Sequence, residues 1–189
     1  MRSLLRFVAV GATVALGSAP IHLSAQVPNA ADVAEVRTQF GEDLDTLYTK
    51  FTALAKAIPA DKYAWRPGPG VRSVGEVFMH VASEFYVYSP MAFGATPSPV
   101  VQRGQEAIKK FEAMSTKDDV LKHLDASHDY AKQALAGVDP SKLTGKTKLF
   151  GGNYNVIETT LGMTDDMHEH LGQLIAYARM NGIKPPWSK

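Results

Sequence analysis

The spacing of the apolar residues is the feature that most constrains the fold of this chain. In four separate stretches these residues recur at alternating steps of three and four, which places them in one stripe along an α-helix. No stretch of useful length alternates apolar and polar residues, as a half-buried strand would. The pattern therefore predicts an all-α domain. Four helices of this length can close around one core as a four-helix bundle.

The expected helices have recognisable starts and ends. They cover residues 31–58, about 74–89, 117–136 and 154–181. Ser73 and Thr116 have the spacing of capping residues for the second and third helices, and Asn153 can cap the fourth. Pro90 is expected to close the second helix. Residues 90–115 combine a loop-like stretch with one that could form a short helical turn or two.

The first 25 residues have the order of a secretory signal peptide. Arg2 and Arg6 precede an apolar run at 7–16, and small residues follow up to Ala25. This run is shorter than the roughly 20 residues that a membrane-spanning helix needs, and no later stretch approaches that length. We therefore expect export to the periplasm or out of the cell without a stable membrane anchor. Cleavage after Ala25 would leave residues 26–189 as one domain.

The composition excludes several classes of function. Without Arg2 and Arg6, the 20 basic residues fall to 18, against 19 acidic ones, and they are scattered along the chain. This balance gives no indication of a nucleic-acid partner. The chain has no cysteine, which excludes a disulfide framework, a zinc-thiolate site and a thiol nucleophile. A metal site would have to consist of histidine, aspartate and glutamate.

Two pairs of ionisable residues lie one helical turn apart on expected helices. His170 falls within the apolar stripe of the fourth helix and Asp166 precedes it by four residues, so both could reach one ion. His80 and Glu84 have the same spacing on the second helix. Each pair also has an ordinary structural interpretation. His170 could be a core histidine bonded to a backbone carbonyl, with Asp166 facing water, and His80 with Glu84 could be a surface pair.

The remaining histidines of the mature chain are weaker candidates. His128 lies on the stripe of the third helix and is a rival or additional ligand. His123 falls off that stripe and is expected to face solvent. His168 is two positions from His170, about 200° around the helix, so it is also expected to be exposed. The sequence contains no nucleophile elbow, phosphate loop, dinucleotide fingerprint or HEXXH motif.

Most of the mature chain resembles the DinB family of YfiT-like proteins. The likeness is carried by IPADKYAWRPGPGVRSVGEVFMHVA, by HLGQLIAYARMNGIKPP and by the intervening TKDDVLKHLDASHDYAKQAL. The resemblance implies a four-helix bundle that binds a metal through one histidine of the second helix and an HxxxH pair of the fourth. Carried over, these positions are His80, His170 and, in place of the first histidine of the pair, Asp166. A homodimer formed through bundle faces is also implied.

The aspartate leaves two outcomes open. Either two histidines and a carboxylate bind Zn²⁺, Ni²⁺, Mn²⁺ or Fe²⁺, or the site has lost its metal. The resemblance implies two chemistries: a transfer or isomerisation that uses a small thiol bound to the metal, and a hydrolysis. Export argues against the former, because small thiols are kept mainly in the cytosol. Hydrolysis of a small molecule, with Glu84 as proton acceptor, is therefore the first hypothesis. The alternatives are a non-catalytic module that binds a metal or small ligand, with His128 or Glu84 as fourth ligand, and a bundle whose site has decayed.

Overall fold

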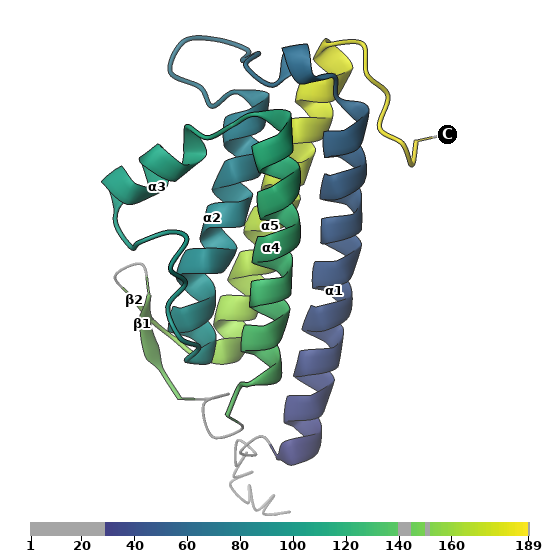
Figure 1. Cartoon of the computed structure of the whole chain (residues 1–189). Coiled ribbons are helices and arrows are strands. Elements are labelled where there is room, and N and C mark those ends of the chain that lie inside the picture. Colours follow the sequence, from purple (N-terminus) through teal and green to yellow (C-terminus); the bar gives the residue numbers. More distant parts are fainter. Residues whose placement is uncertain (1–28, 140–144, 150–151, 189) are drawn as a thin grey trace, which may run out of the picture.

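Four long helices lie side by side in the computed structural model (Figure 1). They are α1 (Ala30–Ala57), α2 (Val74–Phe93), α4 (Lys117–Ala136) and α5 (Val156–Met180). The structure describes residues 29–139, 145–149 and 152–188, so the predicted signal peptide lies outside the described residues. Within the described part, no helix has both the length and the apolar character needed to cross a membrane.

The order of the helices around the bundle differs from their order along the chain. Both α1 and α2 pack against α4 and against α5, so α1 and α2 occupy opposite corners (Figure 1). The segment between them crosses one end of the bundle and contains the 3₁₀ helix η1 (Ala60–Lys62). This arrangement makes α2 and α5 neighbours, although more than 60 residues separate them.

The shorter elements lie on the outer side of α2. A short helix, α3 (Gln105–Glu112), packs against it. The strands β1 (Thr147–Leu149) and β2 (Gly152–Tyr154) form an antiparallel hairpin, in which Thr147 pairs with Tyr154, and β1 contacts α2. The all-α prediction was therefore wrong at this hairpin, whose strands are too short to give a readable alternation.

The helix starts follow the capping chemistry read from the sequence, with one exception. Ser73 and Glu76 form a reciprocal capping box at α2, and the Thr116 side chain accepts the Asp119 N–H at α4. The predicted cap Asn153 instead lies in β2, and Asn155 caps α5. The last prediction was wrong by two residues because the hairpin takes up the chain before the helix begins.

The predicted end of α2 was also wrong. The helix continues through Pro90 to Phe93 and ends at Gly94, which has a φ of +70°. A proline inside a helix removes one backbone hydrogen bond. Ala92 and Phe93 are both buried, and their burial favours continuation of the helix beyond that lost bond.

The core lies between the four helices and follows the stripes predicted from the sequence. Its largest fully buried side chains come mainly from α1 and α2, with one from α5: Phe51, Leu44, Leu47, Leu54, Phe78, Met79, Val74, Val77 and Leu174, together with Ile58 just after α1. Phe51 and Phe78 meet edge to face, with ring centroids 6.3 Å apart. This packing fixes α2, and hence the side chains that it presents to α5.

Gly75, in the first turn of α2, is a point of close approach between segments. Its N–H donates to the Tyr63 carbonyl at 2.9 Å. A Cβ atom at Gly75 would lie 2.2 Å from the Ser115 carbonyl oxygen and 2.8 Å from its Cβ. Ser115 belongs to the connection between α3 and α4, so the absence of a side chain here lets that connection lie directly on α2.

We expect Gly75→Ala to destabilise the protein by about 1–3 kcal/mol, the usual range for overpacking, because the backbone at Ser115 must move. Chemical denaturation measures the change. Gly172→Ala is the control, since a Cβ there meets nothing within 4 Å and the position is helical. That variant should be more stable by about 0.5–1 kcal/mol. Equal stability of the two variants would contradict the close approach.

Candidate metal centre

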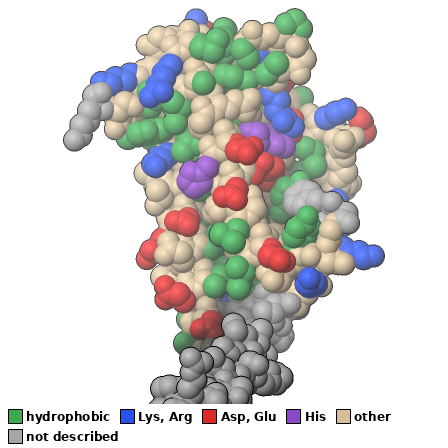
Figure 2. Space-filling view, turned by 180° about the vertical axis from the view of Figure 1, so that it is seen from behind, with side chains coloured by type: hydrophobic (Ala, Val, Ile, Leu, Met, Phe, Trp, Pro, Cys, Tyr) green, Lys and Arg blue, Asp and Glu red, His purple; other side chains and the backbone are tan. Residues whose placement is uncertain are grey.

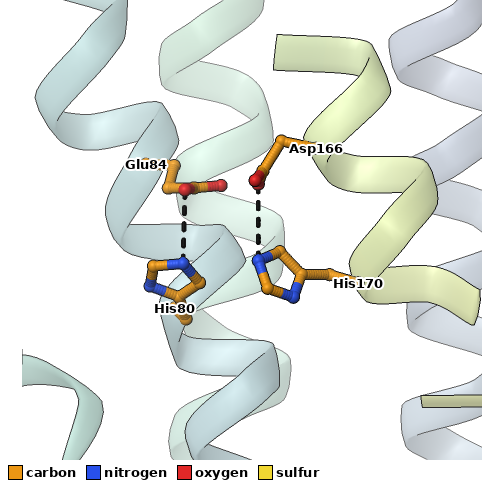
Figure 3. Close-up of side chains that lie close together, drawn as sticks. All are labelled: His80, Glu84, Asp166 and His170. Carbon is orange, nitrogen blue, oxygen red and sulfur yellow. Dashed lines mark ion pairs between the residues drawn. The ribbon is translucent and has the colours of Figure 1, made fainter. Parts of the chain in front are cut away.

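Four ionisable side chains from α2 and α5 converge on one point. His80 and Glu84 come from α2, and Asp166 and His170 come from α5 (Figure 3). One ligating atom from each residue can be chosen so that all four lie within 4.8 Å of one another. The three ligands predicted from the sequence are thus brought together, and Glu84 joins them as a fourth donor.

The distances within the group are short. His80 Nε2 lies 3.3 Å from Glu84 Oε1, and His170 Nε2 lies 3.4 Å from Asp166 Oδ2. The two imidazole rings meet edge to face with centroids 4.8 Å apart. Ligands about 2.0–2.2 Å from one ion lie at most about 4.4 Å apart, so small side-chain movements would place all four on one cation.

His80 is held from behind by a buried carboxylate. Its Nδ1 donates to Glu112 Oε1 at 2.7 Å. Glu112, the last residue of α3, is 7% exposed and also accepts two hydrogen bonds from Arg72, at 3.0 and 3.2 Å. A metal-binding histidine commonly donates its second ring N–H to a carboxylate in this way, which fixes the ring and its tautomer.

His170 is held by an amide in the same manner. Its Nδ1 donates to Gln173 Oε1 at 3.0 Å, and Gln173 Nε2 donates to the Tyr177 hydroxyl at 2.9 Å. The ordinary structural interpretation of His170, a bond to a backbone carbonyl, does not describe this side chain. In both histidines Nδ1 is the donor, so in the neutral rings Nε2 carries the lone pair and faces the group.

One carboxylate oxygen of the group has no hydrogen-bond partner. Asp166 Oδ2 is buried and has no donor with hydrogen-bonding geometry among the described residues, so a protonated Glu84 carboxyl is the neighbour that can donate to this carboxylate when no cation is bound. A buried oxygen of this kind is unfavourable unless something satisfies it. Two imidazole nitrogens with lone pairs and two carboxylates form a donor set that suits a divalent cation, so the residues fit the metal that the family resemblance implies.

Glu84 and Glu112, the two carboxyl groups beside His80, have opposite pKa shifts. Burial, and then the adjacent Asp166, raise the pKa of Glu84 to about 10. Burial acts in the same direction on Glu112, but the hydrogen bonds from His80 and Arg72 outweigh it and hold the pKa of Glu112 below its ordinary value. Glu84 thus faces uncompensated negative charge, whereas Glu112 is paired.

The other candidate histidines lie outside this group. His128, the rival ligand, donates from Nε2 to Asp45 Oδ1 at 2.8 Å and stacks on Tyr48, between α4 and α1. His123, expected to face solvent, is buried between Tyr86 and Phe111, so that prediction was wrong. The rings of Tyr86 on α2 and Phe111 on α3 pack against its imidazole and cover it. His168 is exposed, as predicted.

Sequence reasoning missed the partners behind the ligands. Gln173 follows His170 by three residues on the same helix, so helical spacing alone could have identified it. Glu112 is 32 residues from His80, in a stretch whose structure the sequence did not define, and no local signal connects the two. Figure 2 shows histidine and acidic side chains gathered in the middle of the face seen from behind.

Comparison with known proteins agrees with the fold. The family model of the DinB superfamily matches residues 43–174. Among solved structures, a DinB-like protein from Bacillus cereus ATCC 10987 is similar, with a TM-score of 0.61 at 12% sequence identity, over 80% of this chain and 97% of that one. No curated protein matches. The family match spans well over half of the chain and includes all four residues of the candidate centre, and the fold agrees with it: the chain belongs to the DinB superfamily.

Proposed function

We propose that His80, Asp166 and His170 bind one divalent metal ion and that the protein is a metal-dependent enzyme acting on a small molecule. The observation that carries this proposal is the arrangement of donors. Both histidines are held through Nδ1 with Nε2 toward the group, and between the two helices lies a buried Asp166 oxygen without a hydrogen-bond partner. A structural ion pair would need neither the preset ring orientations nor the unpaired oxygen.

The donor set narrows the choice of metal. Nitrogen and carboxylate ligands without sulfur suit Zn²⁺, Ni²⁺, Mn²⁺ or Fe²⁺. When bound, such an ion supplies Lewis acidity and lowers the pKa of a water molecule, which favours hydrolysis over chemistry that needs a cofactor. Hydrolysis of a small molecule is accordingly the reaction that we propose.

Glu84 has a defined place in this proposal. Its Oε1 lies 3.3 Å from His80 Nε2, and its side chain borders both the group and the adjacent cavity. A carboxylate in this position can accept a proton from an attacking water and return it to a leaving group. We assign this proton transfer to Glu84, and the three remaining donors to the metal.

A second function follows if Glu84 itself binds the metal. Four protein ligands close a tetrahedral site, and closed sites are structural or storage sites rather than catalytic ones. The inclusion of Glu84 among the converging donors is the observation that favours this candidate. The protein would then be a non-catalytic bundle that binds a metal or a small ligand. In the third hypothesis the site has lost its metal. Glu84 and Asp166 would then lie close together without a cation between them.

Export remains a prediction from the first 25 residues, and it bears on the reaction. Arg2, Arg6 and the apolar run that follows favour a compartment outside the cytosol. Small thiols are scarce there, which favours hydrolysis over the thiol-dependent chemistry of the family resemblance. Homodimer formation also remains a prediction.

The first test is metal content. After incubation with Zn²⁺ and removal of the free ion, the wild-type protein should retain about one ion per chain. His80→Ala and His170→Ala should weaken binding by more than the roughly 10- to 100-fold that follows loss of a partner behind a ligand. His168→Ala is the matched control, because His168 lies on the same helix but is exposed and outside the group. Equal retention in all four proteins would contradict the site.

The same proteins test catalysis. Metal-loaded wild-type protein and the His168→Ala control should hydrolyse members of a panel of uncharged 4-nitrophenyl esters and 4-nitroanilides. The His170→Ala variant and the metal-free protein should not. Metal binding without any difference in hydrolysis between these proteins would favour the non-catalytic candidate.

Glu112 should act on the metal through His80. We expect Glu112→Ala to weaken metal binding by about 10- to 100-fold, since His80 loses the acceptor that fixes its ring. Calorimetric titration with Zn²⁺ measures this change. Glu106→Ala, on the same short helix but exposed, is the control and should bind metal as the wild type does. An unchanged affinity in Glu112→Ala would show that the buried carboxylate only supports the fold.

Metal binding should release a proton from Glu84. Its raised pKa, about 10, keeps the carboxyl protonated near neutral pH in the metal-free protein, and a cation nearby favours the ionised form. The affinity for Zn²⁺ should therefore rise as the pH increases toward that value. Calorimetry at pH 8 in buffers of different ionisation enthalpy counts the protons released, at a pH where histidine is ordinarily neutral.

Glu84→Gln is the comparison for this measurement and also separates the two roles. It should release about one proton fewer per metal ion than the wild type, and equal release would contradict the assignment to Glu84. A variant that keeps the metal but loses hydrolysis identifies a proton acceptor. A variant that loses the metal identifies a ligand.

A further inference from the structure

A cavity adjoins the candidate metal centre and is not explained by metal binding. It has a volume of about 310 Å³ and lies between α2 and α5. Glu84 and Asp166 border it at one end, and Phe85, Met163 and Met167 contribute apolar walls. On the face shown in Figure 2, hydrophobic side chains lie just below the acidic ones. A group bound at the metal could therefore extend directly into apolar surroundings.

The cavity is elongated along the bundle. Its α5 lining runs from Glu158 to Met167, and Asp166 lies eight positions after Glu158 on the helix, a rise of about 12 Å. Tyr154 of the hairpin lines the end away from the metal centre. A molecule in this space would have one end at the carboxylates of the centre and the other near the hairpin.

The charges around the cavity are negative. Its lining includes three carboxylates, those of Glu84, Asp166 and Glu158, and no lysine or arginine of the described residues. Arg103 is near enough to Tyr88 to act on its pKa, but it does not line the cavity. Burial and then the adjacent carboxylates raise the pKa of Tyr88 to about 12, so this wall stays uncharged. Among the described lining residues, an anionic body would meet no compensating side chain.

Gly162 provides part of the free space. It lies within α5 in a regular helical position and lines the cavity. A Cβ atom added to it would meet nothing within 4 Å. A larger side chain at this position would therefore enter the cavity without displacing the four residues of the metal centre.

We propose that this cavity binds the apolar body of an uncharged or cationic small molecule, whose polar group is held at Glu84 and Asp166 beside the metal. This inference rests on the proposed metal centre and adds the class of substrate. It excludes substrates whose body carries a carboxylate or phosphate away from the reacting group. The volume, the apolar walls and the acidic border are independent observations that agree on this class.

The test uses the Co²⁺-loaded protein, whose visible spectrum reports coordination of an added nitrogen. Three probes share one ligating group: imidazole, 4-phenylimidazole and 4-(imidazol-4-yl)benzoate. We expect 4-phenylimidazole to bind about 10- to 100-fold more tightly than imidazole, because its ring enters the cavity. The benzoate should bind at least about tenfold more weakly than 4-phenylimidazole, because its carboxylate faces an acidic border.

Substitutions at two glycines test whether the tighter binding of 4-phenylimidazole depends on the cavity. Gly162→Leu should keep the metal and the affinity for imidazole but remove the advantage of the phenyl ring. Gly172→Leu, on the same helix with equally open space but outside the cavity, should behave as the wild type does. Metal retention and thermal unfolding of both variants show whether they are folded, and Gly162→Ala gives a smaller step should Gly162→Leu not fold.

The outcomes separate the two proposals. If the wild-type protein binds Co²⁺ but neither imidazole nor 4-phenylimidazole, or binds both equally, the substrate class is wrong and the metal centre stands. Tighter binding of the benzoate, or an unchanged phenyl advantage in Gly162→Leu, likewise overturns the inference alone. If the wild-type protein takes up no metal, both proposals fail.

Discussion

The burial of α2 is the constraint on which the candidate centre depends. Fourteen of its 20 residues are buried, because the helix contacts α3, α4, α5 and the hairpin. An ionisable side chain on such a helix must find partners, since burial of an unpaired charge is strongly unfavourable. His80 finds one in Glu112 on α3, and that carboxylate is compensated in turn by Arg72. The position of α3 outside the bundle is therefore part of the chemistry of the site.

Glu84, on the same buried helix, has no compensating partner of the kind that His80 has. It lies on the side of α2 that faces α5, where the nearest acidic group is Asp166 and no lysine or arginine side chain is within ion-pair distance among the described residues. The ligating oxygens of Glu84 and Asp166 lie within 4.8 Å of each other, and two carboxylates this close are stabilised when they share a proton or bind a cation. A divalent ion at the histidine nitrogens would satisfy Asp166 Oδ2 and stabilise both carboxylates as anions. The repulsion between the Glu84 and Asp166 carboxylates in the metal-free protein is thus consistent with a site that binds a metal.

The parts of this structure that the sequence predicted are those governed by local periodicity. The stripes located all four long helices, and the i, i+4 pairs identified both halves of the centre, because helical geometry decides each from neighbouring residues alone. The sequence did not indicate that α2 and α5 are neighbours; only the family resemblance implied it. Glu112 and the burial of His123 depend on how α3 packs, and no periodic pattern in residues 90–115 defines that packing. The hairpin before α5 was missed because its three-residue strands are too short to show alternation. The continuation of α2 beyond Pro90 was missed because burial of Ala92 and Phe93 outweighs the local breaker signal of the proline.

Relative to the three histidines that the family resemblance implies, the aspartate at position 166 changes the charge of the site. Three neutral histidines around a divalent ion leave a net charge of about +2, which favours an anionic ligand such as a thiolate. With Asp166 and an ionised Glu84 in the group, the same ion is balanced by two carboxylates and the centre is neutral. A neutral centre attracts an anion only weakly, whereas a neutral molecule can still donate or accept hydrogen bonds there. The aspartate in the ligand set and the acidic border of the adjacent cavity therefore favour the same ligands, and both oppose thiol-dependent chemistry, which the predicted export would also disfavour.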